Sequence, residues 1–167
     1  MRLLATTDST ALARAYRDNR EHLAPWEPSR DDAFFTPAGQ SEQISTHVAG
    51  LASGTEVPWV MTTEERIVGA ITLTGIVRGP FLSAHVGYWV DARLQGQGVC
   101  SGALRAALLH ARDELGLHRV QASVLPRNAP SRAVLDRAGF TVIGLAPSYL
   151  RIAGAWQDHL LYQRILT

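Results

Sequence analysis

The chain contains no lysine, and all 16 of its basic residues are arginine. A Walker-type phosphate loop needs its lysine, and Schiff-base chemistry needs a lysine amine, so the sequence excludes both. Cys100 is the only cysteine, which rules out an intrachain disulfide and a cysteine-rich zinc site. The six histidines show no HExxH or other close metal spacing, so no metal is expected.

The chain also has a small net charge and no long apolar run. The formal charge is +1 over 167 residues, so nothing global draws the chain toward nucleic acid or an anionic membrane. No apolar run approaches the roughly 18 residues that a membrane-spanning helix needs. The segment from Met1 to Leu12 is polar from Thr6 onward and does not read as a secretion signal. A cytoplasmic protein is the default expectation, and a lone free thiol agrees with it.

The residues that are present fit one globular domain over residues 1–167. Hydrophobic residues make up 46% of the chain, enough for a sizeable core. Apolar periodicity predicts helices over residues 8–19, 37–53, 99–115 and 128–138, the first capped by Thr7 or Asp8 and the second by Thr36 before Pro37. It predicts strands over residues 58–63, 67–77, 83–90, 120–125, 140–145 and 157–166, and an ordered loop or broken helix over residues 22–38. This order favours a mixed α/β or α+β domain.

The most informative stretch runs from Gly87 to Gly102. A strand leads into a loop that contains Gly96 and Gly98, and the loop opens a helix. Glycines let successive backbone N–H groups point inward, and a helix start adds unpaired donors and the positive end of its dipole. Together these features predict a phosphate-binding loop, to which Arg93 can add a charge-assisted contact. The same string also fits an ordinary left-handed turn before a helix.

About thirty residues further on comes a second segment, N-x-x-S-x-x-x-L-x-x-x-G-F, from Asn128 to Phe140. In this order and spacing, the two segments resemble the GNAT superfamily of acetyl-CoA-dependent N-acetyltransferases. The strings P-W-E-P from Pro25 and W-x-D-H from Trp156 resemble its RimJ branch, which acetylates the N-terminal alanine of a ribosomal protein. The resemblance spans roughly residues 16–162. It implies the GNAT fold, a mixed, V-shaped central sheet of about 6–7 strands flanked by about four helices.

The resemblance implies that acetyl-CoA is the co-substrate and names the residues that hold it. They are Tyr88, Trp89, Val90, Arg93, Gln95, Gly96, Gln97, Gly98, Val99, Cys100, Ser101, Asn128, Ser131 and Arg132. Among them, Ser131 is implied as the proton donor to the departing thiolate. Asn128 and Ser131 also fit the role of helix caps, and Arg137 fits either a phosphate contact or a solvated helix face.

Cys100 lies at the predicted start of a helix, a position that can lower the pKa of a thiol and make it reactive. In the family this position faces phosphates rather than the thioester. The resemblance therefore implies direct acetyl transfer, without a covalent intermediate on the enzyme.

Two residues compete for the role of general base. His85 lies two residues before Gly87, so both face the same side of the strand, and histidine titrates near neutral pH. Glu27 belongs to the P-W-E-P loop, which lines the acceptor pocket in relatives, and could hold the cationic amine or take its proton. A satisfied sheet histidine and an exposed loop carboxylate are the alternatives. The remaining expected acceptor-site residues are Trp26, Phe34, Phe35, Tyr149, Asp158 and His159. The aromatic residues could instead pack in the core, and Asp158 and His159 could instead make a structural hydrogen bond.

The predicted reaction is acetyl transfer to a primary amine. The first candidate acceptor is a protein N-terminus, by resemblance to the RimJ branch, and the second is a small amine such as an antibiotic, polyamine or amino-acid derivative. A non-catalytic acyl-CoA-binding sensor is the alternative from another class. The sequence leaves the oligomeric state open, a homodimer included.

Overall fold

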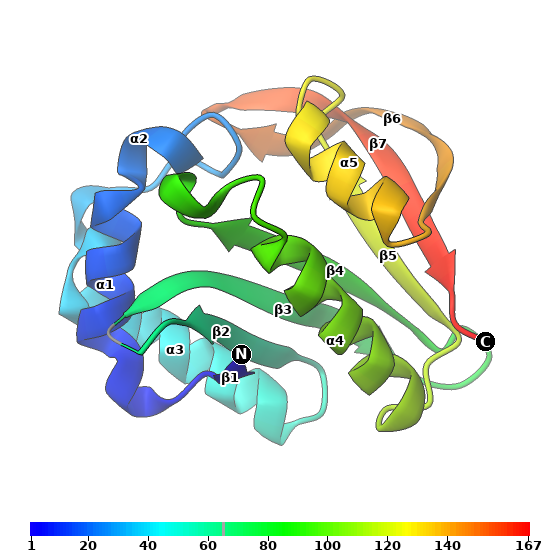
Figure 1. Cartoon of the computed structure of the whole chain (residues 1–167), viewed down its shortest axis with the longest axis horizontal. Coiled ribbons are helices and arrows are strands. Elements are labelled where there is room, and N and C mark those ends of the chain that lie inside the picture. Colours follow the sequence, from blue (N-terminus) through cyan, green and yellow to red (C-terminus); the bar gives the residue numbers. More distant parts are fainter. Residues whose placement is uncertain (65) are drawn as a thin grey trace.

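Seven strands form one sheet in the computed structural model, which describes residues 1–64 and 66–167 (Figure 1). The strands are β1 (Arg2–Leu3), β2 (Val57–Thr62), β3 (Ile67–Val77), β4 (Ser83–Val90), β5 (Arg119–Val124), β6 (Thr141–Ile152) and β7 (Ala155–Ile165). They lie in the order β1-β2-β3-β4-β5-β7-β6. Only β4 and β5 pair in parallel, and the other described pairs are antiparallel.

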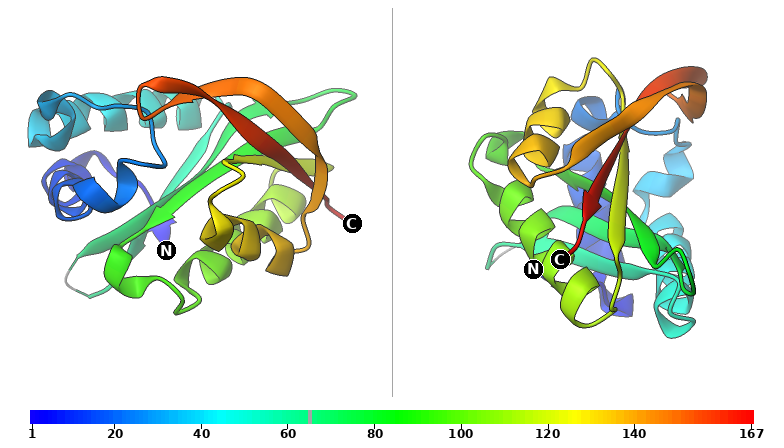
Figure 2. Two further views of the ribbon diagram at one scale, coloured as in Figure 1. Left: turned by 90° about the horizontal axis from the view of Figure 1, so that it is seen from above. Right: turned by 90° about the vertical axis from the view of Figure 1, so that its right-hand side faces the viewer.

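Five α-helices cover the sheet. They are α1 (Ser9–Asp18), α2 (Arg20–Leu23), α3 (Pro37–Ala52), α4 (Val99–Asp113) and α5 (Ala129–Arg137), all within the described residues. Figure 2 shows α1 and α3 on one side of the sheet and α4 and α5 on the other. This is the mixed, V-shaped GNAT sheet that the resemblance implies, with α2 as a short helix beyond the expected four.

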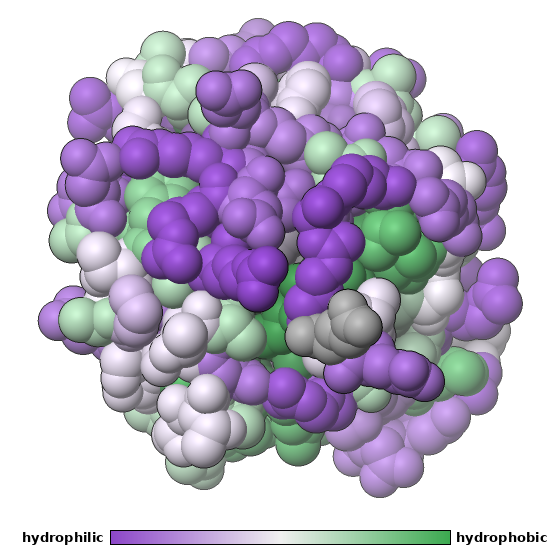
Figure 3. Space-filling view, turned by 60° about the vertical axis from the view of Figure 1, so that its left-hand side comes forward, coloured by the Kyte–Doolittle hydropathy of each residue, from purple (hydrophilic) through white to green (hydrophobic). Residues whose placement is uncertain are grey.

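Each face of the sheet carries its own apolar cluster. Leu104 and Leu108 of α4 pack with Ile71 and Leu73 of β3 on one face. The i, i+4 spacing of the two α4 leucines places them on one stripe of the helix, as the sequence predicts. Leu12, Ile44, Val60 and Trp89 form the cluster under α1 and α3. On the face of the molecule that Figure 3 shows, the most hydrophobic residues show mainly in recesses between hydrophilic side chains.

The sheet opens between β4 and β5, which gives the V its shape. The two strands pair only where Ser83–His85 meet Arg119–Gln121. Beyond His85 they diverge, so the second half of β4 has no sheet partner on that side among the described residues. Figure 1 shows this separation widening toward the end of β4. The backbone of residues 86–90 is therefore free to pair with something that enters the gap.

Most expected elements are present, and the Thr36 cap is confirmed. The Thr36 hydroxyl accepts a hydrogen bond from the Gly39 backbone N–H at 3.1 Å, directly before α3. Asp8 is the N-cap residue of α1, as expected, but its side chain makes no capping hydrogen bond to the helix. Asp8 instead accepts two hydrogen bonds from the Arg2 guanidinium at 2.7 Å, which ties the first strand to this turn.

The strand expected over residues 140–145 is longer than the sequence indicates. β6 continues to Ile152, past Pro147, because it is the edge strand of the sheet and an edge tolerates a residue without an N–H donor. The register shifts between Ala146 and Leu150, where Ser148 has a φ of 47°. A two-residue turn with positive φ at Ala153 and Gly154 then leads into β7.

Candidate functional site

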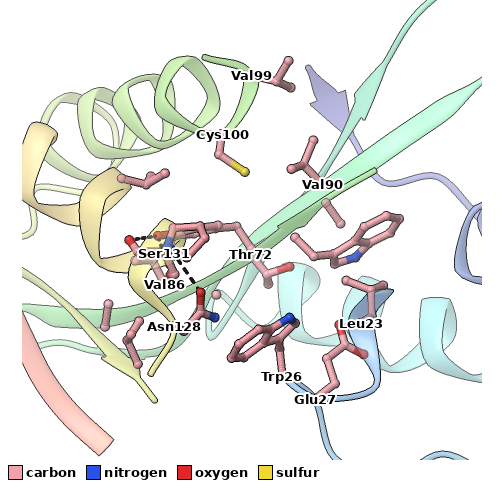
Figure 4. A pocket seen from close by; sticks show the side chains of 18 of the residues that line it. Leu23, Trp26, Glu27, Thr72, Val86, Val90, Val99, Cys100, Asn128 and Ser131 are labelled. Carbon is pink, nitrogen blue, oxygen red and sulfur yellow. Dashed lines mark hydrogen bonds between the residues drawn. The ribbon is translucent and has the colours of Figure 1, made fainter. Parts of the chain in front are cut away.

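A cleft of about 1070 Å³ opens where β4 and β5 separate. Its walls come from both strands, the loop before α4, the start of α5, and the segment from α1 to Arg30. Figure 4 shows Cys100, Asn128 and Ser131 in one part of this cleft, and Leu23, Trp26 and Glu27 together in another. The cleft therefore joins the predicted cofactor loop to the predicted acceptor loop.

The cofactor end is built around two glycines in the left-handed region. Gly96 has a φ of +72° and Gly98 a φ of +81°, and a side chain at either position would be strained. α4 begins directly after Gly98, and no described side chain caps its first turn. The first backbone N–H groups of α4 therefore keep their donors for another partner, beside the positive end of the helix dipole. This geometry fits the phosphate groups of acetyl-CoA.

The structure brings most of the predicted cofactor residues to the cleft. Those that line it are Tyr88, Trp89, Val90, Gln95, Gly96, Gly98, Val99, Cys100, Ser101, Asn128 and Ser131. Three of the predicted residues are not among the described lining residues. Gln97 donates to the Arg93 carbonyl at 2.9 Å, and Arg132 donates to the Pro126 carbonyl at 3.2 Å and the Tyr162 hydroxyl at 3.4 Å. Arg137 does line the cleft.

The third of these residues, Arg93, pairs with a neighbouring carboxylate. Its guanidinium donates to both carboxylate oxygens of Asp91, at 3.0 and 2.7 Å. Asp91 is only 2% exposed and also pairs with Arg66 at 3.2 Å. The hydrogen bonds from Arg93 hold the pKa of the Asp91 carboxyl well below its usual range. Asp91 thus holds the start of the loop before α4 in place, and Arg93 contributes to this through its hydrogen bonds to Asp91.

We expect Asp91→Asn to lower the free energy of unfolding at pH 7 by about 3 kcal/mol, because it removes a buried charge from two arginines. Since the folded pKa is lowered, the wild-type advantage is complete above the unfolded pKa of about 3.9 and is lost as the pH falls through the folded value. Urea titrations at several pH values measure this. Asp113→Asn, at an exposed pair with Arg112, is the control and should change the free energy of unfolding far less. Equal losses would contradict the assignment.

Asn128 and Ser131 combine both roles that the sequence leaves open. The Asn128 side chain caps α5 by accepting from the Ser131 backbone N–H at 3.2 Å, and both residues line the cleft. The Ser131 hydroxyl lies 3.1 Å from the Tyr88 hydroxyl, which also donates to the Ser131 carbonyl at 3.2 Å. Burial raises the pKa of Tyr88, so its phenol stays protonated and can donate. Two linked hydroxyls therefore face the cleft from opposite sides of the gap.

The position at a helix start does not activate the Cys100 thiol. Cys100 is the second residue of α4, but burial raises the pKa of its thiol to about 11. The desolvation of the thiolate outweighs the helix dipole here. A nucleophilic thiolate is therefore scarce at neutral pH.

We expect the Cys100 thiol of the folded protein to react with Ellman's reagent about 100-fold more slowly at pH 7.5 than in urea. The reason is that burial raises the pKa of the thiol from 9.0 to about 11, which lowers the thiolate fraction about 100-fold. The Cys100→Ser protein provides the blank. A thiol that reacts equally fast in the folded and unfolded protein would contradict the assigned pKa.

At the acceptor end, Trp26 and Glu27 line the cleft as expected. Burial raises the pKa of the Glu27 carboxyl, and the charge of Arg30 partly opposes that shift. The Glu27 backbone carbonyl accepts from the Ala153 N–H at 3.0 Å, which ties this loop to the β6–β7 turn. Arg127 lies over the Trp26 ring, 5.6 Å from its centroid. These contacts hold the loop beside the cleft.

Of the other expected residues, His159 is among the described lining residues of the cleft, whereas His85, Phe34, Phe35, Tyr149 and Asp158 are not. His85 is exposed on β4 at the closed end of the V, paired with Thr74 of β3. Phe35 lines a smaller cavity of about 290 Å³ that shares Glu27 with the cleft. Tyr149 packs against His159, with ring centroids 5.8 Å apart. Asp158 accepts from the Ser148 N–H at 2.8 Å, the structural hydrogen bond that the sequence left as the alternative.

Tyr16 and His22 line the cleft, although nothing in the sequence gives either of them a role in the site. Tyr16 accepts a hydrogen bond from the Trp89 indole at 2.9 Å, and His22 lies 3.3 Å from Gln95, so α1 and α2 reach the cofactor strand and loop. His159 lines the cleft, while its neighbour Asp158 does not. Strand alternation in W-x-D-H could have shown that only one of these two faces the cleft. Nothing local signals the contacts of Tyr16 and His22, because their partners lie 73 residues away.

A V-shaped mixed sheet, a glycine loop at a helix start and a cleft between diverging strands define an acetyl-CoA-dependent N-acetyltransferase. Residues 1–141 match the acetyltransferase (GNAT) domain, and the chain belongs to this family.

Several known proteins are similar to this one over nearly its whole chain. The [ribosomal protein uS5]-alanine N-acetyltransferase of Escherichia coli is 35% identical, over 96% of this chain and 84% of the relative. The probable N-acetyltransferase YjcK of Bacillus subtilis is 33% identical, over 95% and 89%. The crystal structure of ribosomal-protein-S5-alanine acetyltransferase from Vibrio fischeri superimposes with a TM-score of 0.94 at 37% identity, covering 99% of this chain and 91% of that one. RimJ of Mycobacterium smegmatis, solved with CoA-disulfide, gives 0.94 at 35%, covering 98% and 80%.

Two further observations concern the described residues alone. None of their helices is long and apolar enough to cross a membrane. No group of three or more His, Cys, Asp or Glu side chains among them could hold a metal ion.

Proposed function

We propose that this protein transfers the acetyl group of acetyl-CoA to the α-amino group at a protein N-terminus. The observation that supports this most is the partly desolvated Glu27 carboxylate in the same cleft as the glycine loop. A carboxylate there suits a cationic amine, and the uS5-alanine enzyme of E. coli is similar over nearly the whole chain. A ribosomal acceptor would also place the enzyme in the cytoplasm.

The chemistry of an α-amino group makes small demands on the protein. Its unperturbed pKa is about 7.7–8.0, so roughly a tenth is neutral near pH 7. A lysine amine, with a pKa of about 10.4, is neutral at well under one part in a thousand. The enzyme can therefore act mainly by positioning the neutral amine and by providing one proton acceptor.

In the proposed reaction, Glu27 first holds the ammonium group of the acceptor and then takes its proton. The amine nitrogen attacks the thioester carbonyl carbon, so that a C–N bond forms as the C–S bond breaks. The Ser131 hydroxyl gives a proton to the departing thiolate and takes one back from solvent, to which Glu27 returns its own. The Tyr88 hydroxyl stays protonated and holds Ser131 by a hydrogen bond. No covalent enzyme intermediate is needed, and the raised pKa of Cys100 argues against a thiol route.

Release of free thiol from acetyl-CoA tests the proposal. The acceptors are a short peptide with a free N-terminal alanine, its N-blocked copy that carries a lysine, and a panel of small amines. Turnover of the free-alanine peptide alone is the expected result. Turnover of a small amine with none of the peptide would overturn the proposal in favour of metabolite or drug modification. Binding of acetyl-CoA without acceptor-dependent turnover would overturn it in favour of a sensor.

A further inference from the structure

The hydroxyl of Tyr16, on α1, carries a proton that none of the described contacts uses. The indole N–H of Trp89 can only donate, so the Tyr16 oxygen is the acceptor in the 2.9 Å hydrogen bond between these side chains. No described hydrogen bond has the Tyr16 O–H as its donor. Burial and the charge of Glu27 raise the pKa of Tyr16, so the phenol keeps its proton at neutral pH. Tyr16 therefore presents an unused donor.

Aromatic contacts hold this donor in place. The Tyr16 ring centroid lies 4.8 Å from that of Trp89 and 4.9 Å from that of Phe34, which meets it edge to face. A ring packed between two others has little freedom to change its rotamer. The Tyr16 hydroxyl is therefore fixed relative to β4, the strand that leads into the cofactor loop.

Glu27 lies in the same wall as Tyr16. Both residues line the cleft and also the smaller cavity of about 290 Å³. The residues that line both cavities are Tyr16, Leu23, Glu27, Pro28 and Arg30. Figure 4 shows the Glu27 side chain beside Leu23. No described hydrogen bond reaches the Glu27 carboxylate, so this wall holds an unused donor together with an unused acceptor.

We infer that Tyr16 is the positioning residue for Glu27, and that its O–H donates to the Glu27 carboxylate after a change of the Glu27 rotamer or through one bridging water. This rests on the proposed function, in which Glu27 takes the proton of the acceptor amine. Tyr16 then holds one lobe of the carboxylate and leaves the other for the ammonium group. The hydrogen bond also favours the ionised form of Glu27 and offsets part of the effect of burial.

The test is the pH profile of kcat/KM for an alanine peptide in Tyr16→Phe, which keeps the ring and removes the hydroxyl. Without the hydrogen bond, the pKa of Glu27 rises, so the acid limb should move about one to two pH units toward higher pH. Above this limb the loss should be far smaller than that of Glu27→Gln. The other charged or titratable groups around the two cavities here stay in the variant, namely Arg20 with its partner Asp32, His22, Arg30, Arg127 and His159.

The double variant Tyr16→Phe/Glu27→Gln separates a positioning role from a merely structural one. At a pH on the wild-type acid limb, Tyr16→Phe alone should lower kcat/KM by about 10-fold or more. Added to Glu27→Gln at the same pH, it should change kcat/KM by less than about 2-fold, because the group through which it acts is gone. A structural role would cost the same factor in both backgrounds. The Kd for acetyl-CoA and the unfolding temperature are measured on each variant, since the Trp89 N–H also loses its partner.

Tyr149→Phe is the matched control. Tyr149 lies on β6, is not among the described lining residues of the cleft, and makes none of the described side-chain hydrogen bonds. Its acid limb should stay at the wild-type pH. An unmoved limb in Tyr16→Phe, or equal losses in the two backgrounds, would overturn this inference alone. If the wild type does not acetylate the peptide, or if Glu27→Gln keeps the acid limb, the proposed role of Glu27 fails and this inference fails with it.

Discussion

Replacement of Gly98 by alanine should raise the Kd for acetyl-CoA by about 10- to 100-fold. The loop needs Gly98 at a φ of +81° to direct the first N–H groups of α4 toward the phosphates. Alanine disfavours that conformation by about 1–2 kcal/mol and puts a methyl group where the phosphate must approach. The loss of one hydrogen bond to a charged group costs about 1.5–3 kcal/mol, which gives the expected range. Calorimetric titration with acetyl-CoA measures it.

The control for Gly98 is Gly54→Ala. Gly54 has a φ of +71° and also no atom within 4 Å of an added Cβ, but it follows α3, far along the chain from the cofactor loop. Both variants should lose similar stability, and only Gly98→Ala should lose affinity. Wild-type affinity in Gly98→Ala, or an equal loss in Gly54→Ala, would show that the glycine loop does not hold the phosphates.

Glu27→Gln should lower kcat/KM for an alanine peptide by about 100- to 10,000-fold, the usual worth of a positioned general base. The active form of Glu27 is ionised, and burial raises the pKa of this carboxyl. Wild-type activity should therefore fall on the acid side at a pH above the ordinary glutamate value of about 4.3, and this limb should disappear in the variant. The measurement is the pH profile of kcat/KM from thiol release.

The same pKa shift predicts a change in stability. Because the folded pKa is raised, the contribution of Glu27 to stability is complete below the unfolded pKa and is lost as the pH rises through the folded value. Glu27→Gln should therefore be more stable than the wild type at pH 7–8, measured by urea unfolding. Glu21→Gln, at an exposed carboxylate on α2, should change neither the pH profile of kcat/KM nor the free energy of unfolding.

The variant His85→Gln separates the two candidate bases. His85 lies at the closed end of the V and is not among the described lining residues of the cleft, so its replacement should leave most of the activity. A large loss in His85→Gln together with wild-type kinetics in Glu27→Gln would assign the base to His85.

The fold and the cofactor loop follow from local signals in the sequence. Apolar periodicity predicts α4, and a threonine before a proline predicts the start of α3. Gly96 and Gly98 can be recognised in the sequence because the backbone conformation of a loop before a helix is set mainly by the residues of that loop. Such features depend on neighbours in the chain, which is why a single sequence reveals them.

The acceptor side depends on contacts that no local pattern records. The hydrogen bond from Trp89 to Tyr16 joins β4 to α1, 73 residues away in the chain, and Trp89 packs in the apolar cluster under α1 and α3. Even neighbouring residues can mislead. Nothing local in the sequence shows that the Arg93 guanidinium pairs with a buried Asp91, or that burial raises the pKa of the Cys100 thiol.

The most direct test of the central claim is to locate the acetyl group on a product. The acceptor is one peptide with a free N-terminal alanine and an internal lysine, incubated with the protein and acetyl-CoA and sequenced by tandem mass spectrometry. We predict acetylation of the alanine nitrogen, with the lysine unmodified. Acetylation of the lysine side chain, or an unmodified peptide under conditions where the protein binds acetyl-CoA, would contradict the account.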